Sequence, residues 1–312
     1  MDVVLLFPGQ GSQKPGMARD LVDALAPARE TFAAVDHALG EPLSQLCFDG
    51  PAETLTLTQN AQPALLAHGA AVWAAVRDRV EPHVKAAAGH SLGEFTAYHA
   101  AGSLGLVDAA RLVRRRGELM RDSGEQRPGT MAAILGDVEG GIEAVCARAS
   151  AEGGCVVAAN YNSPGQVVIS GEIASVERAM ELAKAAGAKR VMRLTVSGAF
   201  HSPLMAVARD GLGAALAEAD LRDPVFPVYA NVTAEPVRTA ADARRLLLDQ
   251  LTSPVAWTSV VQRLAADYPT ALYVEMGPGT VLSGLLKKIA PALQTATCGT
   301  LPEVEQLLTR IA

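Results

Sequence analysis

The chain has 312 residues, of which 49% are hydrophobic and 19% charged, and its formal net charge is -6. Disordered chains combine low hydrophobicity with strong net charge, so this composition indicates a folded protein with a sizeable core, in one large domain or two ordinary ones. The acidic balance and the lack of any Lys/Arg run longer than Arg114–Arg116 argue against nucleic acid as a partner.

Four widely separated cysteines form neither a metal-binding pattern nor a disulfide framework. They indicate free thiols in a reducing compartment. The N-terminal apolar run is too short for a signal peptide, and the other apolar stretches are broken before the roughly 20 residues that a membrane helix needs. We therefore expect a cytoplasmic protein, monomeric and without membrane segment, metal or cofactor.

Short β-branched runs alternate with helical patterns in the first 125 residues. This alternation is typical of an α/β layer with a mostly parallel sheet. The elements expected here are a strand at 3–7, a helix at 63–79, a strand at 84–88, a helix after Ser91 and a helix at 108–120.

The pattern changes near residue 129 to strand, helix, strand, strand, helix and strand, the order of a small ferredoxin-like unit. Its helices are expected at 139–151 and 173–187, and its last strand near 189–196. The first pattern then returns, with a helix at 203–219, a strand at 225–231, helices within 241–265 and a strand at 271–276. We therefore predict an α/β protein whose large subdomain, 1–125 and 198–312, is interrupted by a small one, 126–197.

A candidate nucleophile lies in the pentapeptide GHSLG, residues 89–93, directly between an expected strand and an expected helix. This is the context of a nucleophile elbow, in which the glycines permit a sharp turn and the central serine stands at a helix N-terminus. The helix dipole there favours developing negative charge. Ser91 is the predicted nucleophile, and an ordinary glycine-rich turn is the alternative.

A serine needs a base, and His201 is the best of the six histidines. His201 lies in a loop before Ser202, a good helix cap, and Pro203, a good first helical residue. The other histidines fall in helical patterns, in a polar turn or beside Ser91 on the elbow. No Asp or Glu between Ser91 and His201 stands out as a third member, so we expect a dyad whose second imidazole nitrogen contacts a neutral acceptor.

The loop that follows the first strand, PGQGSQ at 8–13, brings flexible backbone close to any ligand. An oxyanion hole formed by the backbone N–H groups of Gln10 and Leu92 would suit it. A dinucleotide-binding loop is the rival interpretation, but the third glycine of G-x-G-x-x-G is missing.

Arg116 lies on the apolar face of its expected helix, whereas Arg114 and Arg115 point elsewhere. An unpaired buried charge costs several kcal/mol, so such an arginine either meets a fixed carboxylate or binds an anionic ligand. Near a serine nucleophile, this favours an acyl substrate that carries a carboxylate, which a guanidinium can bind with two parallel hydrogen bonds.

Together these motifs resemble the malonyl-CoA:acyl-carrier-protein transacylase family, which includes discrete polyketide-synthase acyltransferases. The similarity runs the full length of the chain, and the motifs that carry it are LFPGQGSQ (6–13), TQNAQPAL (58–65), GHSLGEFTA (89–97), RRRGELM (114–120), MAAILG (131–136), NYNSPGQVVISG (160–171), VSGAFHSPLM (196–205), QLTSPVAWT (250–258) and EMGPGTVLSGL (275–285).

The resemblance implies an α/β-hydrolase-like large subdomain with a ferredoxin-like insertion. It implies malonyl transfer from coenzyme A to the phosphopantetheine thiol of an acyl carrier protein, in fatty-acid or polyketide synthesis, and no further cofactor. The roles that it implies for single residues are acylation of Ser91, acid–base chemistry by His201, carboxylate binding by Arg116, an oxyanion hole at Gln10 and Leu92, pocket lining by Gln62, orientation of His201 by the Gln250 carbonyl, and an acyl-size limit at Phe200.

Other functions stay open on the sequence alone. A thioester hydrolase would use the same Ser91 and His201, and a trans-acting polyketide acyltransferase would carry another extender unit. A carrier-docking protein without catalytic activity would need neither residue, and a nucleotide-binding protein would need the loop at Gly9. Carrier proteins are acidic, so docking needs local basic groups, for which Lys189–Arg190 and Lys287–Lys288 are the candidates.

Overall fold

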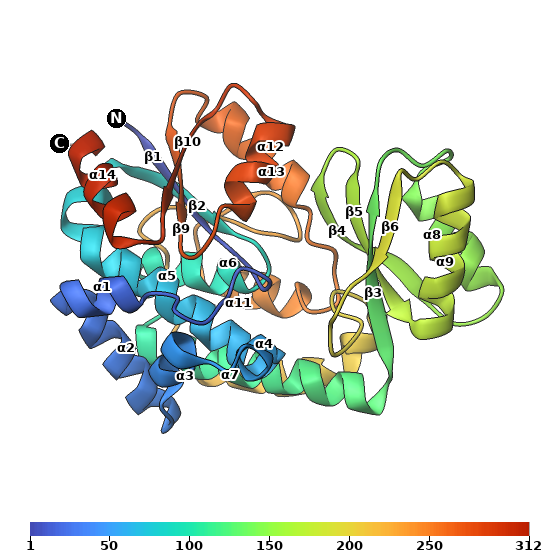
Figure 1. The fold of residues 1–312 in the computed structure, drawn as a ribbon, viewed down its shortest axis with the longest axis horizontal. Helices are drawn as coiled ribbons and strands as arrows, with labels where there is room; N and C mark the ends of the chain where they lie inside the picture. The colour runs from blue at the N-terminus through green and yellow to red at the C-terminus, as the bar shows by residue number, and fades with distance from the viewer. Residues whose placement is uncertain (312) are drawn as a thin grey trace.

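The computed structural model describes residues 1–311, which form a larger and a smaller unit (Figure 1). The larger unit contains a six-stranded mixed sheet in the order β10-β9-β1-β2-β7-β8, in which β7 and β8 are antiparallel and the other neighbours are parallel. Its strands are β1 (Val3–Phe7), β2 (Val84–Gly89), β7 (Val228–Tyr229), β8 (Pro236–Val237), β9 (Leu272–Met276) and β10 (Gln294–Cys298). The protein therefore has an α/β fold.

The central strand β1 is buried along its whole length. Its alternate side chains enter two separate apolar clusters, Val3, Leu5 and Phe7 on one face and Val4 and Leu6 on the other. This period of two, with both faces covered, is what a parallel strand inside an α/β layer requires.

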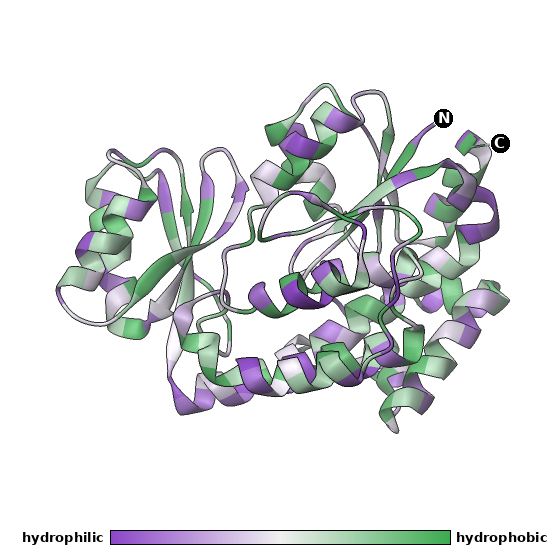
Figure 2. Ribbon diagram, turned by 180° about the vertical axis from the view of Figure 1, so that it is seen from behind, coloured by the Kyte–Doolittle hydropathy of each residue, from purple (hydrophilic) through white to green (hydrophobic). Residues whose placement is uncertain are grey.

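Helices cover both faces of this sheet, and Figure 2 shows mostly hydrophobic strands surrounded by helices of mixed hydropathy. Within residues 1–311, no helix combines the length and apolar character that crossing a bilayer requires. The helices are α1 (Arg19–Ala24), α2 (Ala26–Leu39), α3 (Leu43–Asp49), α4 (Ala52–Thr56), α5 (Thr58–Val80), α6 (Leu92–Ala100), α7 (Leu106–Gln126), α10 (Arg209–Glu218), α11 (Ala240–Asp249), α12 (Trp257–Asp267), α13 (Val281–Ile289) and α14 (Leu301–Ile311), with 3₁₀ turns η1 (Glu81–His83) and η2 (Pro203–Ala208).

The smaller unit is an antiparallel sheet in the order β4-β5-β3-β6, backed by two helices. Its elements are β3 (Gly129–Leu135), α8 (Ile142–Ala151), β4 (Val156–Ser163), β5 (Gln166–Glu172), α9 (Ile173–Ala185) and β6 (Arg190–Arg193). Ile134 and Ile169 pack with the two helices, whereas Met131 and Val168 belong to the main core. The sheet therefore presents one face to its own helices and the other to the larger unit.

Several element boundaries differ from those that the sequence predicts. The helix predicted at 108–120 runs from Leu106 to Gln126, and the one predicted at 203–219 begins as the 3₁₀ turn η2. The strand predicted at 225–231 keeps only two residues, because Pro227 has no N–H to donate to the sheet.

Candidate active site

Ser91 lies in a tight turn between β2 and α6, with a left-handed backbone (φ 51°, ψ -105°) that non-glycine residues rarely adopt. Gly89 and Gly93 allow this turn, since a Cβ on Gly89 would overlap the Gly93 backbone and a Cβ on Gly93 would overlap the Phe7 carbonyl oxygen. The turn raises the Ser91 side chain at the N-terminus of α6, where the helix dipole favours an anion.

The side chains of Ser91 and His201 are in direct contact, with 2.8 Å between Ser91 Oγ and His201 Nε2. The other ring nitrogen, Nδ1, lies 2.9 Å from the backbone carbonyl oxygen of Gln250. A carbonyl only accepts, so Nδ1 carries the proton and Nε2 is free to accept the serine proton. His201 itself has a left-handed φ of 55°, and Ser202 caps the following turn η2.

Burial and, as the second cause, the nearby Arg116 charge lower the pKa of His201 to about 3. The imidazole is therefore neutral at pH 7, which is the form that a general base needs. Transient protonation of His201 then depends on the negative charge that develops on the substrate during the reaction.

Arg116 extends from α7 into the same site and is only 1% exposed. Its Nη2 lies 3.1 Å from Ser91 Oγ and 2.9 Å from Gln250 Oε1, and its Nη1 lies 2.7 Å from Gln62 Oε1. The guanidinium also lies over the Phe95 ring, 5.3 Å from its centroid. Within residues 1–311 it forms no salt bridge.

Burial lowers the pKa of Arg116 to about 10, so the side chain stays charged at pH 7. A buried cation whose acceptors are neutral is poorly compensated, and a ligand carboxylate would supply what it lacks. Arg116 therefore favours an anionic acyl group. Because the guanidinium contacts Ser91 Oγ, a short diacid bound to Ser91 could reach it with its free carboxylate.

A cavity of about 350 Å³ opens above these side chains, between the larger unit and the sheet of the smaller one. Its lining includes Gln10, Leu92, Phe200, Asn162 and Met131, in addition to Ser91, His201 and Arg116. The size suits an extended acyl thioester chain better than a large rigid ligand.

The backbone N–H groups of Gln10 and Leu92 make no hydrogen bond within residues 1–311. Their loops are adjacent because β1 and β2 are parallel neighbours, with Phe7 opposite Gly89. The His90 N–H donates to the Phe7 carbonyl oxygen at 3.0 Å and joins the two loops. Two free donors beside Ser91 are what an oxyanion hole requires.

The structure brings together all eight predicted site residues. Gln62, on α5, donates to Thr58 and accepts from Arg116, and Phe200 closes one side of the cavity. Among residues 1–311, no three His, Cys, Asp or Glu side chains are grouped closely enough to hold a metal ion.

Sequence reasoning missed two polar residues under the site, Glu94 and Asn231. Glu94 is one of the acids between Ser91 and His201 that do not stand out in the sequence, but it is fully buried. Asn231 accepts the Ser91 N–H at 2.7 Å and donates to the Gly89 carbonyl at 2.7 Å, and so it fixes the turn. The only sequence signal for Glu94 was its position three residues after the nucleophile, in the first turn of α6.

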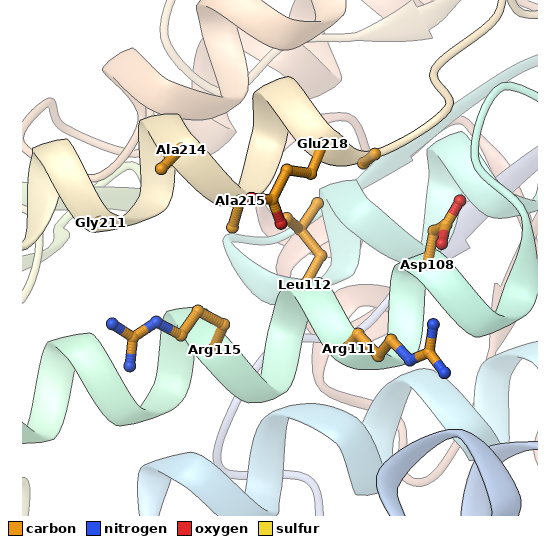
Figure 3. A pocket seen from close by; sticks show the side chains of 9 residues that line it. Asp108, Arg111, Leu112, Arg115, Gly211, Ala214, Ala215 and Glu218 are labelled. Carbon is orange, nitrogen blue, oxygen red and sulfur yellow. The ribbon is translucent and has the colours of Figure 1, made fainter.

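A larger hollow, about 530 Å³, lies elsewhere, between α7 and α10 (Figure 3). Leu112 points toward Ala215 and Glu218 there, and the side chains of Arg111 and Arg115 extend along α7. The hollow is open and contains no nucleophile or buried polar side chain, so it lacks the parts of a catalytic site.

Comparisons with known proteins agree with this chemistry. Residues 4–306 match the family described as the acyl transferase domain. The malonyl CoA-acyl carrier protein transacylase of Bacillus subtilis is 45% identical over 294 residues, covering 94% of this chain and 92% of the relative. The Escherichia coli K12 protein of the same name is 44% identical over 289 residues, covering 92% and 93%.

Solved structures agree as well. An acyl-carrier-protein-S-malonyltransferase from Bartonella henselae has a TM-score of 0.95 at 41% identity, covering 100% of this chain and 99% of that one. A malonyl-transacylase in complex with its type II polyketide-synthase acyl carrier protein has a TM-score of 0.95 at 38% identity, covering 99% and 100%. With these full-length matches, and with Ser91 and His201 in direct contact at a tight strand-to-helix turn, the chain belongs to the acyl transferase family.

Proposed function

We propose that Ser91 carries a malonyl group from malonyl-CoA to the phosphopantetheine thiol of an acyl carrier protein. The chain is a malonyltransferase that serves fatty-acid or polyketide synthesis, as its relatives' names and its resemblance to them indicate. The single observation that carries the substrate assignment is the buried Arg116 guanidinium, which has no carboxylate partner and lies 3.1 Å from the nucleophile oxygen.

In the first half-reaction, His201 Nε2 takes the hydroxyl proton of Ser91 while Oγ attacks the thioester carbon. The carbonyl oxygen becomes an oxyanion and is stabilised by the N–H groups of Gln10 and Leu92. The C–S bond then breaks, and the coenzyme A sulfur leaves with the proton from His201. The product is a malonyl ester on Ser91.

The second half-reaction runs the same steps with a different thiol. The phosphopantetheine thiol gives its proton to His201, and its sulfur attacks the ester carbon through an oxyanion held by the same two N–H groups. The C–O bond to Ser91 breaks, and Oγ recovers its proton from His201. One site therefore performs both transfers.

The far end of the malonyl group is bound by Arg116, with Gln62 and Gln250 holding the guanidinium from behind. Phe200 lines the cavity beside His201 and limits substituents at the malonyl α-carbon. Acidic carrier proteins would dock near Lys287–Lys288 in the last turn of α13, where Lys288 also donates to Gln166 of the smaller unit at 3.2 Å.

We also propose an α/β-hydrolase-like larger subdomain, 1–125 with 198–312, and a ferredoxin-like insertion, 126–197. The nucleophile turn after β2 supports the first, and the strand order β4-β5-β3-β6 supports the second.

Intact-protein mass after mixing with malonyl-CoA tests the proposal. The expected result is a malonyl adduct that is lost in Ser91→Ala, retained in Ser12→Ala, and transferred to added carrier protein. Release to water at the same rate with and without carrier protein would instead identify a thioester hydrolase. An adduct that survives Ser91→Ala would refute the assignment of the nucleophile.

A further inference from the structure

The mechanism makes no use of Glu94, although this carboxyl group lies directly beneath the reacting side chains. Glu94 is the third residue of α6 and has no exposed surface. It forms no salt bridge within residues 1–311, and burial raises its pKa to about 7 against the opposing effect of its hydrogen bonds and of Arg116. A buried carboxyl group without an ion pair is costly, so its hydrogen bonds must offset the cost of burial.

One oxygen of Glu94 holds two segments of the site at once. Oε2 accepts the side-chain N–H of Gln250 at 2.7 Å and the backbone N–H of Asn231 at 3.1 Å, whereas Oε1 has no hydrogen-bond partner. Glu94 is not the third member of a triad, because His201 Nδ1 donates to the Gln250 backbone carbonyl. Its contacts reach the reacting groups only through other residues.

The Gln250 side-chain amide connects Glu94 to Arg116. Its NH₂ group donates to Glu94 and, at 3.0 Å, to the Ser91 carbonyl oxygen, so its own oxygen faces the other way and accepts from Arg116. If the amide turned by 180°, its NH₂ group would face the guanidinium, and two donors would meet. The acceptor oxygen of Glu94 therefore determines whether the side-chain oxygen or the NH₂ group of Gln250 faces Arg116.

We propose that Glu94 is a positioning residue for acyl selectivity, which fixes the Gln250 amide and thereby holds Arg116 in the orientation that receives the malonyl carboxylate. This role rests on the proposed malonyl transfer. It needs the acceptor oxygen at its observed place and not the charge, because a proton on the unpartnered Oε1 leaves Oε2 an acceptor.

Two substitutions separate the position of the acceptor from its charge. Glu94→Gln can place its amide oxygen where Oε2 lies and keep both hydrogen bonds without the charge. Glu94→Asp keeps a carboxyl group but withdraws it by about one methylene, roughly 1.5 Å, which is too far for a hydrogen bond to Gln250. If the position of the acceptor matters, Glu94→Gln keeps the selectivity and Glu94→Asp loses it. If the charge matters, the two variants behave the other way round.

The experiment compares kcat/KM for malonyl-CoA and for acetyl-CoA with the same carrier protein. Glu94→Gln is expected to keep the malonyl-to-acetyl ratio within about threefold of the unsubstituted protein, and Glu94→Asp to lower it about tenfold, the effect of one lost hydrogen bond to a charged group. Gln250→Met removes the connecting amide while leaving the backbone carbonyl in place. It is expected to lower the ratio as Glu94→Asp does, and it serves as the second test if Glu94→Asp does not fold.

Asn231→Ala is the matched control, because it removes the amide side chain that holds the Ser91 turn and keeps the backbone N–H that donates to Glu94. It is expected to slow malonyl and acetyl transfer by the same factor. The inference would be overturned if Glu94→Asp slowed both substrates equally, or if the malonyl-to-acetyl ratio stayed unchanged in Glu94→Asp and Gln250→Met. It would also be overturned if Glu94→Gln lowered that ratio. If no variant and not even the unsubstituted protein transferred malonyl, the proposed function itself would fail.

Discussion

Replacing Arg116 by methionine would separate recognition of the acyl group from the chemistry at Ser91. Methionine fills similar volume and removes the guanidinium. A malonyl carboxylate would lose two charge-assisted hydrogen bonds, each worth about 1.5–3 kcal/mol. Without substrate, the guanidinium already donates hydrogen bonds to Gln62, Ser91 and Gln250. The net gain from binding the carboxylate is therefore at the lower end of about 1.5–3 kcal/mol for each bond.

We therefore expect a loss of about 3 to 4 kcal/mol in transition-state binding, or about a 10²–10³-fold fall in kcat/KM for malonyl-CoA. Acetyl-CoA has no carboxylate and leaves Arg116 without a direct carboxylate partner, with only the longer-range effect of the Glu94 carboxyl group. Its kcat/KM should stay within about threefold or rise, because the substitution removes an uncompensated charge.

The assay measures transfer of each acyl group from coenzyme A to carrier protein, at several substrate concentrations. Arg115→Met is the control, since this neighbour on α7 is half exposed, lies outside the active-site cavity and pairs with Glu118 at 3.5 Å. Both substrates should be transferred normally by that variant. A parallel fall for malonyl and acetyl transfer in Arg116→Met would refute the reasoning, and so would undiminished malonyl transfer.

Two further predictions concern stability. Because burial lowers the pKa of His201 from 6.5 to about 3, the native state resists protonation, and stability is lost as pH falls below 6.5; between pH 7 and 5 this amounts to about 2 kcal/mol. Urea unfolding at both pH values should show that extra loss in the unsubstituted protein and not in His201→Asn, whose side chain tolerates the left-handed backbone. The new methyl group of Gly93→Ala would overlap the Phe7 carbonyl oxygen, which should lower the free energy of unfolding by about 3 kcal/mol or more and abolish acylation. Gly284→Ala, whose methyl group would meet no atom within 4 Å, should be neutral or slightly stabilising. Equal unfolding midpoints for the two variants would contradict this prediction.

The residues that the sequence could predict are those whose local pattern already contains their role. Ser91 lies between a strand and a helix, and Arg116 interrupts an apolar helix face, so short windows of sequence are enough to select both. His201 was selected by its loop and by the cap that follows it. The structure brings the three side chains together.

The supporting residues have no such local pattern. Gln250 contacts Ser91 and Glu94 across more than 150 residues of chain, and Asn231 contacts Ser91 across 140. Their amide side chains are ordinary polar groups in any short window. Their roles depend on tertiary contacts, which is why Gln62 and Gln250 were reached only through family resemblance, and Glu94 and Asn231 were not reached at all.

Some predicted element boundaries were wrong because they too depend on tertiary contacts. The helix predicted to end at residue 120 continues as α7 to Gln126. Gly124 makes this possible, since a Cβ there would overlap the carbonyl oxygen of Ser197 in the returning chain. A glycine that ends a helix in isolation can instead mark the close approach of another segment.

The pairing of polar groups within the site also limits which substrates fit. Among the site residues described above, the groups left without an adequate partner are the N–H groups of Gln10 and Leu92 and the charge of Arg116, with Ser91 between them. A thioester oxygen on its way to an oxyanion satisfies the first two, and only a carboxylate at the other end of the acyl group satisfies the third. A simple acyl thioester would complete one half of the site and leave the buried Arg116 without a carboxylate partner, and this imbalance predicts a preference for malonyl over acetyl.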